Sequence, residues 1–136
     1  MSAGSSGDGA SRQGSIVVLV VDSDEHARFI YRSMLLHHGY DVVTVSDGPT
    51  GLQICDASPP NVIVIDVDPP TCSSLDIVRA LAEHPRYRGR TIAMTRRAMH
   101  HEQPALRAIH FAALLIKPVD PKLVVSAVRG AFGIAD

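Results

Sequence analysis

Length, composition and charge already exclude several classes of protein. The chain has 136 residues, 46% of them hydrophobic, which is enough for one sizeable core but not for two ordinary domains. Its formal net charge is −1, with both signs mixed along the chain, so it lacks the single-sign field that attracts nucleic acid or an anionic membrane. We therefore expect neither partner.

Targeting and cysteine signals favour a cytoplasmic location. No apolar run approaches the roughly 20 residues that span a bilayer, and the start of the chain lacks the apolar core of a signal peptide. The two cysteines, Cys55 and Cys72, have neither metal-ligand spacing nor the density of a disulfide framework. A reducing compartment fits this usage best.

The first segment, residues 1–15, is expected to be a disordered tail, because nine of its fifteen residues are Gly or Ser and bury almost nothing. Residues 16–136 alternate short apolar runs with longer segments of helical period, the pattern of βα units in a parallel sheet. Residues 16–21 are a continuous β-branched run, as expected of a strand covered on both faces. We expect strands at 16–21, 42–45, 61–66, 91–95 and about 113–116.

Helices are predicted between these strands. Apolar residues recur at three- and four-residue steps from Asp24 to His38, and Gly39 follows as a stop signal. Asp47 and Asp120 read as caps with proline just inside the next helix. We expect helices at 24–38, 48–57, about 74–83, near 102–110, and from 121 to about 131. The fold class is thus α/β, with five βα repeats.

Four of the five predicted strands end in groups with reactive or anion-binding chemistry, namely Asp22, Asp66, Thr95 and Lys117. In an open parallel sheet the ligand crevice lies at the carboxyl ends of the strands. Clustered carboxylates there need a cation, and oxygen ligands suit Mg²⁺. A carboxylate can also attack a phosphoryl group, with an ammonium and a hydroxyl around the phosphate oxygens. Asp66 is the expected centre of this chemistry.

In order and placement, these residues resemble the receiver domain of two-component response regulators, over about residues 16–132. Val-Leu-Val-Val-Asp22 resembles the first strand of that family, and Asp66-Val67-Asp68-Pro69-Pro70 resembles its phosphoacceptor and proline loop. Thr95 falls at the switch position, and Lys117-Pro118 resembles a Lys-Pro pair whose peptide bond is often cis. The resemblance implies a flavodoxin-like, doubly wound sheet with strand order 2-1-3-4-5.

The resemblance also implies a function. Asp66 would accept a phosphoryl group from a histidine kinase or phosphotransfer protein, with Mg²⁺ held by Asp66, by Asp22 through water, and by the carbonyl of Asp68. Thr95 would turn toward the phosphate, with Lys117 beside it, and signal to a downstream protein effector through the face of helix 4, strand 5 and helix 5. Such a chain is a signalling module and not an enzyme. The same face, near Ala105, Ile109 and Val125, is a plausible homodimer surface.

Three positions depart from the family pattern. Ser23 stands where a second carboxylate usually binds the metal, so a weaker magnesium site is expected. Asp24 can replace that ligand if the loop shifts by one residue, or it merely caps the first helix, and Asp68 could add a carboxylate from the other side. Leu114 replaces the usual Tyr or Phe. Arg96 replaces a small residue and would either obstruct the phosphate or bind it.

Three hypotheses remain open from the sequence. The first is a stand-alone receiver phosphorylated on Asp66, because only a few residues follow the last helix. The second is a degenerate receiver that binds proteins without phosphorylation, which the three departures favour. The third is an unrelated flavodoxin-like enzyme or cofactor binder, although no phosphate-cradling Gly-rich turn follows the first strand.

Overall fold

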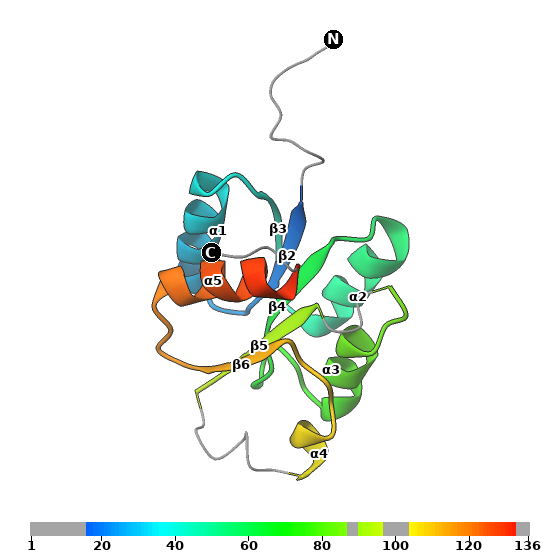
Figure 1. The fold of residues 1–136 in the computed structure, drawn as a ribbon. Coiled ribbons are helices and arrows are strands. Elements are labelled where there is room, and N and C mark those ends of the chain that lie inside the picture. The colour runs from blue at the N-terminus through cyan, green and yellow to red at the C-terminus, as the bar shows by residue number, and fades with distance from the viewer. Residues whose placement is uncertain (1–15, 87–89, 97–103, 133–136) are drawn as a thin grey trace.

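The computed structural model describes residues 16–86, 90–96 and 104–132, and the tail predicted at 1–15 lies outside them. Helices cover both faces of one parallel sheet (Figure 1). The strands are β2 (Val17–Val21), β3 (Asp41–Val45), β4 (Val62–Asp66), β5 (Thr91–Thr95) and β6 (Ala113–Ile116). The helices are α1 (Glu25–His37), α2 (Gly48–Ala57), α3 (Leu75–Ala82), α4 (Pro104–Arg107) and α5 (Pro121–Ala131).

The sheet order is β3-β2-β4-β5-β6, with every pair parallel. Counted along the chain this is 2-1-3-4-5, which confirms the predicted topology. The order reverses between β2 and β4, where Val21 pairs with Ile65. Asp22 and Asp66 therefore follow side by side at the switch point, where ligand sites of such sheets form.

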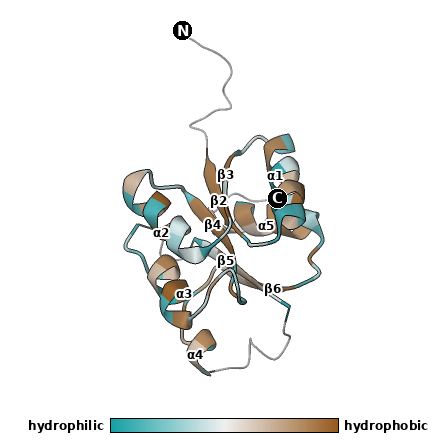
Figure 2. Cartoon of the chain, turned by 180° about the vertical axis from the view of Figure 1, so that it is seen from behind, coloured by the Kyte–Doolittle hydropathy of each residue, from teal (hydrophilic) through white to brown (hydrophobic). Residues whose placement is uncertain are grey.

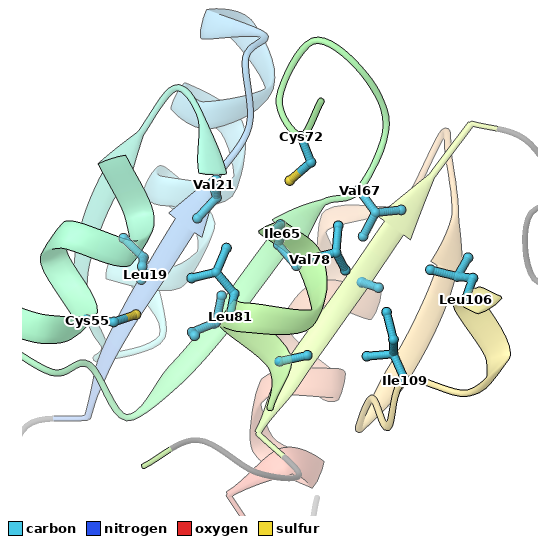
Figure 3. Packing of buried hydrophobic residues seen from close by; sticks show 13 residues of the cluster. Leu19, Val21, Cys55, Ile65, Val67, Cys72, Val78, Leu81, Leu106 and Ile109 are labelled. Carbon is cyan, nitrogen blue, oxygen red and sulfur yellow. The ribbon is translucent and has the colours of Figure 1, made fainter. Parts of the chain in front are cut away.

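The central strands bury both of their faces, so alternate residues enter two different cores. Leu19 and Ile65 pack with α2 and α3 on one face (Figure 3), whereas Val18 and Val20 pack with α1 and α5 on the other. This double burial explains the continuous apolar runs in the sequence. The middle of the sheet is accordingly hydrophobic, as its brown colour in Figure 2 shows. A stiff sheet of this kind fixes the residues at its strand ends.

The helix boundaries follow the predicted signals. Gly39 adopts a φ of 93° after α1, a conformation that glycine reaches without the steric cost of a Cβ atom. The carboxylate of Asp24 accepts the backbone N–H groups of His26 and Ala27, and that of Asp47 accepts the N–H of Thr50. Each therefore caps a helix.

Helix α4 is shorter than predicted, because it ends at Arg107 and not near residue 110. Ile109 continues the apolar period of the sequence, yet it is buried beyond the helix, where the chain turns to enter β6. Residues 102 and 103, the predicted start, lie outside the described residues. Among the helices described, none is long and apolar enough to cross a membrane.

Candidate functional site

The four predicted strand-end residues lie at one edge of the sheet. Asp66 and Thr95 are the last residues of β4 and β5, and Asp22 and Lys117 directly follow β2 and β6. The Lys117 ammonium lies 2.7 Å from Oδ2 of Asp22 and 3.6 Å from Oδ2 of Asp66. The Lys117–Pro118 peptide bond is cis. One cation thus joins residues that are up to 95 positions apart in the sequence.

Asp22 is fully buried, and both of its carboxylate oxygens are engaged. Oδ2 accepts the hydrogen bond from Lys117, and Oδ1 accepts the backbone N–H of Asp24 at 2.9 Å. Burial lowers the pKa of Lys117, but the hydrogen bond to Asp22 and the charges of Asp66 and Asp22 outweigh it and leave that pKa above its usual value. Lys117 therefore carries its charge at neutral pH.

Asp66 is 5% exposed and sits in a shell of donors. Its Oδ1 accepts the backbone N–H of Asp68 at 3.0 Å, and its Oδ2 accepts the hydroxyl of Thr71 at 3.1 Å. Burial raises the pKa of Asp66, although the Asp68 N–H and the charge of Lys117 oppose this rise. Ionised Asp66 is thus held in place at some cost in stability.

Thr71 belongs to this site, and the sequence reasoning missed it. Its buried hydroxyl donates to Asp66 and accepts the backbone N–H of Ser23 at 2.8 Å, which ties the β4–α3 loop to the start of α1. The available signal was a hydroxyl residue placed after two prolines, five positions beyond Asp66. That signal has no periodicity and becomes informative only with the loop in view.

Asp68 contributes its side chain to the site. The family resemblance implied that its backbone carbonyl binds the metal, and the sequence suggested its carboxylate only as an additional metal ligand. Oδ1 accepts the hydroxyl of Thr95 at 2.7 Å, and Oδ2 accepts the backbone N–H of Arg96 at 2.8 Å. Arg96 thus acts through its main chain, and its side chain is exposed. The Asp68 carbonyl accepts the N–H of Cys72 at 3.1 Å. The loop and the end of β5 are joined through one buried carboxylate.

The predicted magnesium ligands are engaged by groups of the chain itself. Asp22 is paired with Lys117, the Asp68 carboxylate is bonded to β5, and Asp24 is exposed and caps α1. Hydrogen bonds from the Ala27 and His26 N–H groups lower the pKa of Asp24, as expected of a cap. Across the described ranges, no three His, Cys, Asp or Glu residues are arranged to hold a metal. Ser23 adds only a neutral hydroxyl.

A cavity of about 500 Å³ opens beside the site, between α1 and the loop that follows β6. Its lining includes Tyr31, Arg96, Lys117 and Pro118. It gives solutes access to Lys117 from the α1 side. Leu114 does not contribute to the site, because it packs against the core on the α2 and α3 face.

Comparison with known proteins identifies the family to which the chain belongs. A family model of the response regulator receiver domain matches residues 18–129. The chain belongs to this family, which serves two-component signalling. The chemotaxis response regulator CheY4 of Vibrio cholerae has the same fold, with a TM-score of 0.75 over 86% of this chain and 98% of CheY4, at 23% identity.

Curated relatives differ in how much of their length the chain covers. The polar-differentiation response regulator DivK of Brucella anthropi is 23% identical over 87% of this chain and 97% of DivK. The alkaline phosphatase synthesis transcriptional regulatory protein PhoP of Bacillus subtilis is 33% identical over 48% of this chain. The circadian input-output histidine kinase CikA of Synechococcus elongatus is 28% identical over 83% of it. The chain spans only 28% of PhoP and 15% of CikA.

Proposed function

We propose that this chain is a receiver that accepts a phosphoryl group on Asp66 and passes the signal on by protein contact. An oxygen of the Asp66 carboxylate attacks phosphorus, the P–N bond to a donor phosphohistidine breaks, and its electron pair leaves with the imidazole nitrogen. The donor is a histidine kinase or a phosphotransfer protein. The acceptor of the signal is a downstream protein, and the setting is cytoplasmic.

The observation that carries this proposal is the position of Lys117 between Asp22 and Asp66, 3.6 Å from the acceptor oxygen. Two anions must meet in the reaction, so a fixed ammonium at the point of contact lowers the barrier. The side chain of Lys117 is 8% exposed and already held by Asp22, which means that little reorganisation is needed.

Intact-mass measurement after treatment with acetyl phosphate tests the proposal. We expect the addition of one phosphoryl group in the wild type, loss of this adduct in Asp66→Asn, and its retention in Asp76→Asn, an exposed acidic residue of α3. The reaction is run with and without Mg²⁺, because Ser23 stands where a metal-binding carboxylate is expected. An adduct that persists in Asp66→Asn would place the acceptor elsewhere and refute the assignment.

A second candidate function is a degenerate receiver that binds its partner without phosphorylation. Ser23 in place of a carboxylate and the engagement of Thr95 by Asp68 favour it. For this candidate we expect no phosphoryl adduct on the protein in the presence of Mg²⁺ or Mn²⁺, whether the donor is acetyl phosphate or a phosphorylated kinase. It also expects that Asp66→Asn leaves partner binding unchanged.

Self-association through the face of α4, β6 and α5 stays a prediction, but the residues that could form the contact differ from those proposed from the sequence. Ile109 and Val125 are 3% and 4% exposed, so they pack within the chain and are not free for a second copy. Ile116 and Leu123, which are 39% and 54% exposed, are the apolar side chains available on β6 and α5. Light scattering of the wild type and Leu123→Ser measures whether they support a dimer.

A further inference from the structure

The Asp68 carboxylate lies inside the site and not in solvent. The residue is 6% exposed, and its two oxygens bond separately to the end of β5, one to the Thr95 hydroxyl and one to the Arg96 N–H. These distances, 2.7 and 2.8 Å, are those of charge-assisted hydrogen bonds. An anion already occupies these two donors.

The loop backbone aims this carboxylate at β5. The N–H of Asp68 donates to Oδ1 of Asp66, and its carbonyl accepts the N–H of Cys72. Because both backbone groups are bonded, the side chain leaves the loop in a fixed direction. The engagement of Thr95 is therefore part of the fold and does not depend on a mobile surface side chain.

By the family resemblance, a phosphoryl group on Asp66 would be contacted from the end of β5, where Thr95 lies. A hydroxyl and a backbone amide each carry one proton to donate, so the donors that Asp68 holds are not free for a second anion. Asp22 and Asp66 already bring two carboxylates to the ammonium of Lys117, and a phosphoryl group would add more negative charge.

We propose that the Asp68 carboxylate is an internal substitute for the phosphoryl group. It holds Thr95 and Arg96, at the end of β5, in their anion-bound arrangement without phosphorylation, and it competes with any phosphoryl group on Asp66. The first consequence, that Asp68 holds Thr95 and Arg96, concerns the unphosphorylated protein alone. The second consequence, competition with a phosphoryl group, rests on the proposed function of Asp66. The two are tested by separate measurements.

Amide hydrogen exchange tests the first consequence in the full chain. Asp68→Ala removes the acceptor of the Arg96 N–H, and we expect that amide to exchange about tenfold faster or more, while the amide of Leu19 in β2 is unchanged. Asp76→Ala, which removes an exposed carboxylate from the first turn of α3, is the matched control and leaves Arg96 unaffected. Equal exchange of the Arg96 amide in wild type and Asp68→Ala overturns the proposal.

The near-isosteric Asp68→Asn keeps the test decisive if the alanine variant does not fold. Its amide offers one acceptor oxygen in place of two, so one of the two bonds to β5 is lost. We then expect either faster exchange at Arg96 or an altered side-chain resonance of Thr95. A spectrum in which neither group differs from the wild type refutes the internal anion.

Phosphoryl uptake tests the second consequence. With acetyl phosphate as donor, we expect Asp68→Ala to gain the phosphoryl group on Asp66 about tenfold faster than the wild type. Equal rates in the two proteins would overturn the competition. An absence of adduct in both would overturn the proposed function of Asp66, and the exchange of the Arg96 amide alone would then decide the role of Asp68.

Discussion

The ammonium of Lys117 lies 2.7 Å from Oδ2 of Asp22, and this carboxylate is fully buried. A buried ion pair contributes little net stability, but removal of one partner leaves an uncompensated charge in a medium of low polarity. This asymmetry makes Lys117 a strong determinant of stability as well as a candidate for phosphate contact.

We expect Lys117→Met to lower the free energy of unfolding by about 3 kcal/mol, because it leaves Asp22 buried and unpaired. Urea denaturation at neutral pH measures the change. Arg79→Met is the matched control, since the Arg79–Glu83 pair has side chains 43% and 41% exposed and should contribute less than about 0.5 kcal/mol. Similar small losses in both variants would contradict the buried-pair argument.

We expect Asp66→Asn to stabilise the protein by about 1 kcal/mol at pH 7. Burial raises the pKa of Asp66 in the folded state. The Asp66 carboxyl therefore stabilises the fold fully only at a pH below its unfolded pKa of 3.8, and this stabilisation is lost as the pH rises through the folded pKa. The ionised group therefore opposes folding at neutral pH, and asparagine removes the charge with little change of shape.

Denaturation in EDTA, at a series of pH values, checks this prediction for Asp66. The difference between wild type and Asp66→Asn should shrink as pH falls toward the folded pKa, where the wild-type carboxyl becomes neutral. A variant that is less stable than the wild type, or a difference independent of pH, would show that the contacts with Asp68 and Thr71 outweigh the burial.

The strand ends were predictable from the sequence because the chemistry changes abruptly there. The buried run before Asp66 contains only apolar residues, so the carboxylate that follows it had to lie at the edge of the sheet. The same logic placed Asp22, Thr95 and Lys117. Their convergence followed from parallel topology, in which all carboxyl ends share one edge.

The loops and the short helix were not predictable in the same way. The path after Pro69–Pro70 has no period, so nothing in the sequence indicated that Thr71 turns back to Asp66 or that the Asp68 side chain reaches β5. The predicted end of α4 was wrong because Ile109 keeps the apolar spacing of a helix, although it is buried in the turn that follows α4. Tertiary packing, which local patterns do not encode, decided each of these.

Gly48 supports the site from the start of α2, where its N–H donates to the carbonyl of Thr71 at 2.8 Å. A Cβ atom at this position would clash with Ile77 and lie 3.2 Å from the sulfur of Cys72. We expect Gly48→Ala to lower the free energy of unfolding by about 1–3 kcal/mol, as in other overpacked cores.

Gly130→Ala is the matched control for Gly48→Ala. It lies in α5, and a Cβ atom there meets nothing within 4 Å. Alanine favours the helix, so this variant should gain up to about 1 kcal/mol in the same urea denaturation assay. The prediction for Gly48 is wrong if both glycines tolerate alanine equally.

Cys72 reports on the integrity of the loop that carries Asp68. It is 1% exposed, and burial, aided by the charges of Asp66, Asp47 and Asp68, raises its pKa from 9.0 to about 12. The difference of three between these values reduces the thiolate at pH 8 about a thousandfold. In a Cys55→Ala background, we expect Cys72 to react with a disulfide reagent far more slowly in native than in unfolded protein.

Thr71→Ala should release part of that protection at Cys72. The variant removes the hydroxyl that joins Asp66 to the N–H of Ser23, so the loop opens more often and exposes the neighbouring thiol. We expect labelling about tenfold faster than in the Cys55→Ala parent, since such a bond is worth about 1.5 kcal/mol. Ser73→Ala, an exposed hydroxyl in the same loop, should leave the rate unchanged. If it accelerates labelling as much as Thr71→Ala, the bond to Asp66 is not what closes the loop.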